Sequence, residues 1–141
     1  MGQARATIAM ALLLIASPAL AAGNTAGFEM GGNYRRFDPV VSQYNQSGEL
    51  FRIDGHCQSS CTLFLSIRNV CVSRSATLLF HSAHDRNGNP SPSNTEHMLA
   101  AYNPQLREYL VSHHYMETLA FYAISGSDMI RKFGYRACPQ K

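Results

Sequence analysis

The sequence predicts an α/β domain, because short strand patterns alternate along it with helical patterns. Alternating or continuous apolar residues at 50–54, 70–72 and 78–80 are typical of short strands. Apolar residues at helical spacing occur before them, at 38–46, and after them, from position 103 to 113. This alternation favours a small parallel or mixed sheet with right-handed crossover helices.

The first helix and the following turn are defined by their flanking residues. Pro39 suits the first position of a helix that begins near Asp38, and Gly48 is typical of its end. After the strand at 50–54, Ser59 or Ser60 is placed to cap a helix that continues to about residue 67.

Helical signals dominate the second half of the chain. Ser93 and Glu96 have the spacing of a capping box, and Asn103-Pro104 starts a further helix. A short helix is expected at 127–133, ended by Gly134, and a final strand at 135–138.

The first 22 residues predict export. They combine one positive charge, Arg5, with an apolar run from 8 to 16 and the small residues Ala19-Leu20-Ala21, which is the pattern of a secretory signal peptide. No later segment approaches the ~20 apolar residues of a membrane span. We expect a signal peptide at 1–22, one domain at 23–141, no later membrane span, and a periplasmic or secreted location.

The charge balance argues against two classes of partner. The chain has 12 Lys and Arg against 9 Asp and Glu, with no basic run and no basic-aromatic stripe. We therefore expect neither nucleic acid nor an anionic membrane as a partner. No phosphate-binding loop is present, so no nucleotide cofactor is expected.

The even number of cysteines predicts two disulfides in an exported chain. Cys57–Cys61 with Cys71–Cys138 is one consistent pairing, and Cys57–Cys71 with Cys61–Cys138 is nearly as good. A zinc site with His56 or His81 is the competitor, but Cys-x3-Cys is not a common zinc spacing, so no metal is expected. A redox centre at Cys57 and Cys61 would need a reactive thiol.

The segment "GHCQSSC" at 55–61 carries the candidate chemistry. A serine in a turn between strand and helix projects from the carboxyl edge of the sheet, where ligands of open α/β sheets bind. The amide of Cys61, at a helix N-terminus, is a plausible oxyanion donor for Ser60. His81 or His84 is the candidate base. A simple helix cap is the competing role for the serine.

The stretch 55–81, "GHCQSSCTLFLSIRNVCVSRSATLLFH", resembles the proteolytic subunit of Clp protease, related Clp/crotonase-fold serine peptidases and small exported Clp-protease-like proteins of bacteria. The resemblance implies that Ser60 is the nucleophile, that the Cys61 amide binds the oxyanion, and that His81 is the base. Ser59 is the alternative nucleophile if the register differs by one residue.

Two flanking segments extend the resemblance. Gly31-Gly32 lies where such enzymes carry an oxyanion loop, which implies Gly32 as a second oxyanion donor, and "SGSDMIRKFGY" implies Asp128 as the third catalytic residue. Met30 replaces the proline that normally adjoins the glycine pair. Almost no chain precedes Gly31 for the N-terminal strands, so a truncated, disulfide-stapled Clp/crotonase-like fold is expected.

The sequence thus predicts an exported serine hydrolase or peptidase with a Ser60-His81-Asp128 site acting on a peptide or protein. The resemblance also implies a homo-oligomer. The alternative is a non-catalytic, disulfide-stapled module that binds a protein or peptide or has a structural role.

Overall fold

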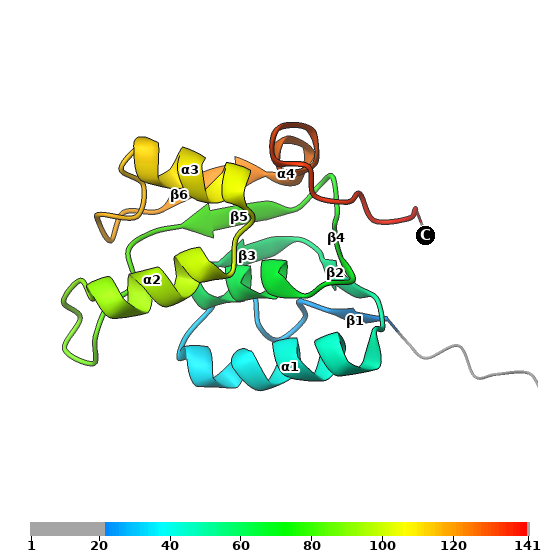
Figure 1. Ribbon diagram of the computed structural model, residues 1–141, viewed down its shortest axis with the longest axis horizontal. Coiled ribbons are helices and arrows are strands. Elements are labelled where there is room, and N and C mark those ends of the chain that lie inside the picture. Colours follow the sequence, from blue (N-terminus) through cyan, green and yellow to red (C-terminus); the bar gives the residue numbers. More distant parts are fainter. Residues whose placement is uncertain (1–21, 141) are drawn as a thin grey trace, which may run out of the picture.

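The computed structural model describes residues 22–140, which form two small sheets flanked by helices (Figure 1). The first sheet is parallel, in the order β1 (Gly23–Asn24), β2 (Phe51–Ile53), β4 (Val70–Val72). The second has the order β3 (His56–Gln58), β5 (Thr77–Phe80), β6 (Tyr122–Ser125), with β3 parallel and β6 antiparallel to β5. The α/β class with parallel and mixed pairing is confirmed.

The chain passes from the first sheet to the second at Gly55. The residues expected as one strand followed by a turn form two strands, β2 and β3, which belong to different sheets. Gly55 joins them with a φ of 60°, a left-handed conformation that glycine adopts without steric cost. This bend gives the serine turn its own strand, β3, to support it.

The flanking residues correctly predict both ends of α1, the start of α3 and the end of α4. Helix α1 (Asp38–Ser47) has proline in its first turn and ends at Gly48, in the left-handed conformation. Asn103 caps α3 (Pro104–Ser112) by accepting from the Leu106 amide. Gly134, also left-handed, ends α4 (Gly126–Phe133).

The other expected helix starts are corrected by the structure. Residues Ser59–Ser66 form a 3-10 helix, η2, and neither serine caps it, because Gln58 is the cap residue and makes no side-chain cap bond. The side chain of Ser91, not the Ser93–Glu96 box, caps α2 (Pro92–Ala100). A short 3-10 helix, η1 (Tyr34–Arg36), precedes α1.

The expected last strand is reduced to a single parallel bridge. Ala137 pairs with Val72 of β4, and the amide of Cys138 donates to the Val72 carbonyl at 3.0 Å. The C-terminal segment therefore lies along the edge of the first sheet.

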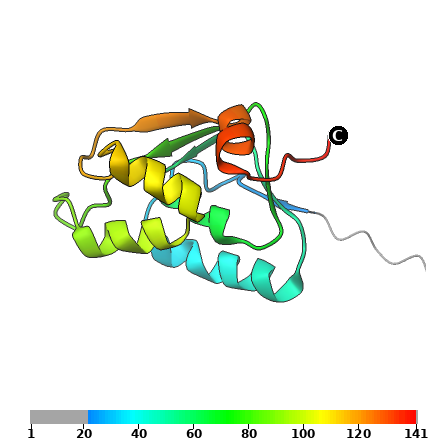
Figure 2. The same cartoon turned by 45° about the horizontal axis from the view of Figure 1, so that its top comes forward.

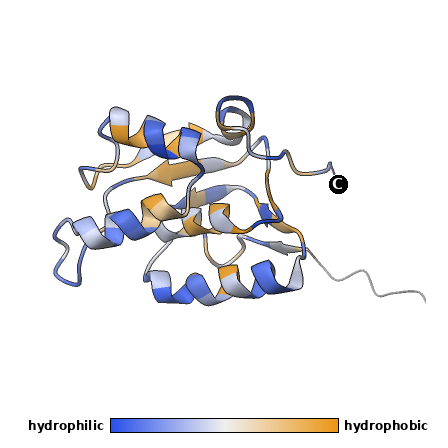
Figure 3. Ribbon diagram, in the orientation of Figure 1, coloured by the Kyte–Doolittle hydropathy of each residue, from blue (hydrophilic) through white to orange (hydrophobic). Residues whose placement is uncertain are grey.

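Helix η2 lies at the centre of the core. Its residues 60–65 are all buried, and it packs against β5, α1 and α2. The Phe64 ring contacts Phe51, at 4.5 Å between centroids, and Phe37, at 5.4 Å. Figure 3 shows apolar residues along β5, and apolar and polar residues alternating along the helices. Both ribbon views place α1 and α4 on opposite sides (Figures 1 and 2).

Two disulfides join Cys57 to Cys61 and Cys71 to Cys138, which is the first of the two expected pairings. Disulfides of this kind form and persist in oxidising compartments, so they indicate a location outside the cytoplasm. The expected signal peptide lies almost entirely outside the described residues. Within the described part of the chain, no helix has the length and apolar character needed to cross a membrane.

Candidate functional site

Strand pairing brings the serine turn and His81 to the same edge of the second sheet. Strands β3 and β5 are parallel neighbours, and Gln58 at the end of β3 pairs with Leu79. Ser59 follows β3 directly, and His81 follows the last residue of β5. Since parallel strands end at a common edge, the two candidate partners leave the sheet side by side.

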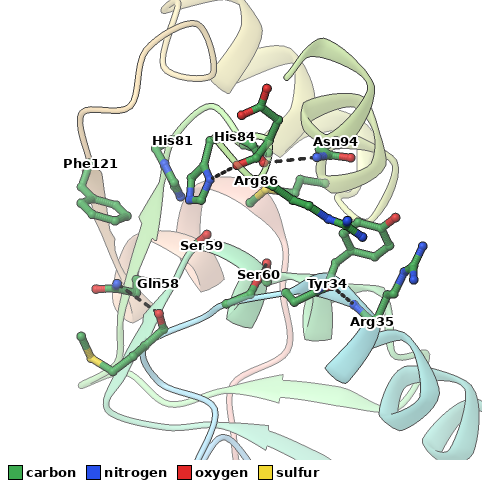
Figure 4. Close-up of a pocket in the computed structure, with 16 residues that line it drawn as sticks. Tyr34, Arg35, Gln58, Ser59, Ser60, His81, His84, Arg86, Asn94 and Phe121 are labelled. Atoms are coloured by element: carbon green, nitrogen blue, oxygen red, sulfur yellow. Dashed lines mark hydrogen bonds between the residues drawn. The ribbon is translucent and has the colours of Figure 1, made fainter. Parts of the chain in front are cut away.

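The two serines of this turn have different surroundings. Ser60 is buried, and its hydroxyl donates to the Gly32 carbonyl at 2.6 Å. Ser59 is partly exposed, has a φ of 54°, and its hydroxyl makes no hydrogen bond to another described residue. A left-handed conformation is costly for a residue other than glycine and is concentrated at functional sites. Figure 4 shows the Ser59 hydroxyl directed toward the His81 ring.

The expected Gly31-Gly32 loop does lie against the serine turn. Gln58 fixes it there, with its amide on the Glu29 carbonyl at 2.9 Å and its side-chain nitrogen on the Met30 carbonyl at 3.2 Å. A Cβ at Gly31 would lie 2.8 Å from the Ser59 Cβ and 3.2 Å from the Ser60 nitrogen. Only glycine therefore lets the loop approach this closely.

The backbone amides around the turn provide candidate oxyanion donors. In a 3-10 helix whose cap residue is Gln58, the first i→i+3 bond involves the amide of Cys61. The amides of Ser60 and Gly32, in contrast, donate to no acceptor among the described residues. The Ser60 amide adjoins Ser59 in the chain, and Gly32 lines the same pocket. Ser60, and not Cys61, therefore has the free amide of the turn.

His81 is a buried base without a hydrogen-bonding partner. His81 is 4 % exposed, and neither nitrogen of its ring has a hydrogen-bond partner among the described residues. The ring of Phe121 covers it, at 4.5 Å between centroids. Desolvation, and secondarily the nearby charge of His84, lower the pKa of His81, so the imidazole is neutral at pH 7 and able to accept a proton.

The structure does not bring Asp128 to His81. Strand β6 runs antiparallel to β5, and its last residue, Ser125, pairs with Thr77 at the start of β5. Helix α4 follows directly. Asp128, in the first turn of α4, therefore lies near the start of β5, whereas His81 follows the end of β5. Of the three residues implied as a catalytic triad, the described structure brings only the serine turn and His81 to one pocket.

The Asp128 carboxylate is instead bound within its own helix, by Arg131 at 2.6 Å and Lys132 at 3.1 Å. These bonds lower its pKa. We therefore expect Asp128→Asn to label with a fluorophosphonate at the wild-type rate, whereas loss of an aspartate that orients a catalytic histidine slows acylation by about 10⁴-fold. A large loss of labelling in this variant, with an unchanged melting temperature, would return Asp128 to the site.

The serine turn and His81 open into one pocket of about 520 Å³ (Figure 4). Its lining includes several side chains that the sequence did not single out: Tyr34, Arg35, Arg86, Asn94, Met98 and Phe121. They come from η1, α2 and the loops after β5 and before β6, and no local motif marks them. Among the described residues no cluster of three or more His, Cys, Asp or Glu side chains is arranged to hold a metal ion.

The resemblance to Clp proteases rests on the residues quoted for it. No protein-family model matches the sequence, and no curated protein shows significant similarity to it.

Proposed function

We propose that this protein is an exported serine hydrolase of Clp/crotonase type, acting on a peptide or ester carbonyl through a Ser-His dyad. The observation that carries the proposal is the buried His81 ring, whose nitrogens lack partners beside a strained serine turn. An unsatisfied buried polar group costs about 1–3 kcal/mol. Such a cost is typical of a site kept for chemistry rather than for stability.

The geometry favours Ser59 over Ser60 as the nucleophile. The proton of Ser60 is already engaged by the Gly32 carbonyl, at 2.6 Å, so Ser60 joins the glycine loop to the turn. Ser59 lines the pocket, has a left-handed backbone, and its hydroxyl has no hydrogen-bond partner among the described residues. Ser59, the alternative nucleophile one residue before Ser60, therefore fits the site better.

The proposed chemistry needs only groups present in the pocket. Ser59 Oγ attacks the substrate carbonyl carbon while His81 accepts the hydroxyl proton, and the amides of Ser60 and Gly32 stabilise the oxyanion. The C–N or C–O bond then breaks, and the leaving group takes the proton from His81. Water, deprotonated by His81, cleaves the acyl-enzyme and restores the serine.

The test is labelling of the purified, disulfide-bonded protein with a fluorophosphonate probe, with Ser59→Ala and Ser60→Ala in parallel. We expect labelling of the wild type and of Ser60→Ala, and none of Ser59→Ala. Mass spectrometry of the labelled peptide identifies the modified serine. Labelling lost only in Ser60→Ala would assign the nucleophile to Ser60, as the sequence first indicated.

A non-catalytic binding module is the second candidate, and one observation favours it. No hydrogen bond joins either serine to His81 among the described residues, and no aspartate orients the ring. Catalytic hydrogen bonds are often long in structures without substrate, so this alone does not exclude catalysis. Absence of labelling in a folded, oxidised wild type would establish the binding module as the better account.

A further inference from the structure

The pocket has two chemically different walls. Figure 4 places His81 and Phe121 on one side and Tyr34 and Arg35 on the other, with the Arg86 side chain extending toward Tyr34. Both arginines line the same cavity as Ser59. Its volume of about 520 Å³ lies within the usual range for sites that bind small ligands or a few residues of a peptide.

The arginines of the pocket carry positive charge that the described residues do not neutralise. Neither Arg35 nor Arg86 forms an ion pair with a described carboxylate. Asp85 is the acidic residue of the lining, and its carboxylate accepts the amides of Asn87, at 2.8 Å, and Asn89, at 3.0 Å, within its own loop. Both amides bind the same oxygen, Oδ1, and the carboxylate forms no ion pair with Arg35 or Arg86.

Arg36, the neighbour of Arg35, shows what an occupied arginine looks like in this region. Its guanidinium lies 5.5 Å from the Phe28 ring centroid and donates to the Gly27 carbonyl at 3.4 Å. It is absent from the pocket lining. Unlike Arg36, Arg35 and Arg86 line the pocket, and their side chains have no hydrogen-bond partner among the described residues.

We propose that the pocket selects substrates that carry a carboxylate next to the acyl group placed at Ser59. The guanidinium group offers paired donors that match a carboxylate, and two exposed arginines that line one cavity concentrate positive charge there. An apolar group of the substrate then contacts Phe121, beside the base. This inference rests on the proposed hydrolase site, and it names the class of substrate for that site.

A binding experiment that needs no hydrolysis tests the proposal. The Ser59→Ala protein is titrated by NMR or calorimetry with N-acetyl-Ala-Phe and with its C-terminal amide. We expect the acid to bind about tenfold more tightly than the amide, the effect of one hydrogen-bonded charge pair. A third probe, N-acetyl-Glu-Phe-amide, separates recognition of a chain terminus from recognition of an acidic side chain.

The arginines are then removed, with a control of the same charge change. Arg35→Gln/Arg86→Gln in the Ser59→Ala background should bind acid and amide equally, whereas Arg74→Gln, in the loop between β4 and β5, should keep the preference. Equal binding of acid and amide to the parent protein, no binding of either peptide at millimolar concentration, or a preference lost equally in Arg74→Gln would overturn the proposal.

The outcome of this experiment is independent of fluorophosphonate labelling. A labelled serine with no preference for the acid refutes the carboxylate specificity and keeps the hydrolase. An unlabelled protein that prefers the acid refutes the hydrolase and leaves a carboxylate-binding module.

Discussion

Replacing Cys71 and Cys138 together with alanine should lower the free energy of unfolding by about 4 kcal/mol. The bridge joins residues 67 positions apart, so it excludes many open conformations of the unfolded chain. The Cys57–Cys61 bridge spans only 4 positions, and its removal should cost about half as much in the same chain-entropy model. Domains of this size are stable by about 5–15 kcal/mol, so the first change removes a large part of the total.

The structure gives a second reason for the larger effect of the long bridge. The C-terminal segment is attached to β4 by two backbone bonds of Val72, from its amide to Arg136 at 2.8 Å and from Cys138 to its carbonyl at 3.0 Å. A single β-bridge at the edge of a sheet is weak when no disulfide supports it. We therefore expect the C-terminal segment to detach in the Cys71→Ala/Cys138→Ala variant.

Urea unfolding of the oxidised wild type and of both double-alanine variants measures these differences. The Cys57→Ala/Cys61→Ala protein is the matched control, because it loses the same number of sulfur atoms and one disulfide. Equal losses in the two variants would show that local distortion of the serine turn, and not loop closure, determines the contribution of each bridge.

The sequence predicted those parts of the fold that depend on local chemistry. Pro39 lies at the start of α1 and Gly48 at its end, Asn103 caps the start of α3, and Gly134 ends α4. These signals are readable in sequence because caps and left-handed glycines act within one helical turn. The disulfide pairing was one of two alternatives that sequence could not separate. The α/β class followed from the alternation of these elements.

The parts that sequence did not predict depend on contacts between distant segments. Strand β3 is three residues long and exists because Thr77–Leu79 of β5 pairs with it. Helix η2 is buried along six consecutive residues, so its sequence has no amphipathic period to identify a 3-10 helix. The position of Asp128 follows from the antiparallel direction of β6, which no local motif specifies.

The candidate site divides in the same way. The order of the glycine pair, the serines and His81 placed them correctly in one region, because each ends a strand or lies against a strand end. Ser59 has a left-handed backbone that no local motif predicts, and Arg35 reaches the pocket from η1 and Phe121 and Arg86 from loops. These features became visible only with the tertiary structure.

His81→Phe should abolish the chemistry and stabilise the fold. Removing the proposed general base should slow labelling by about 10²–10⁴-fold. Replacing a buried imidazole that has no partners with an apolar ring next to Phe121 should raise the free energy of unfolding by about 1 kcal/mol, because two unsatisfied nitrogens are removed. His113→Phe, at the exposed end of α3, is a control in which neither quantity should change much.

The pH dependence of stability gives an independent readout of the same residue. The pKa of His81 in the folded protein lies below the value of 6.5 of an unfolded chain, so the unfolded chain binds more protons as the pH falls below 6.5. The wild type should therefore lose stability on acidification below that pH, and this part of the loss should be absent in His81→Phe. The rate of labelling should increase with pH, with an apparent pKa below 6.5, because the neutral imidazole is the form that accepts the proton. If His81→Phe is less stable than the wild type and keeps the same acid sensitivity, the imidazole has partners in solution, and the cost assigned to the buried ring does not exist.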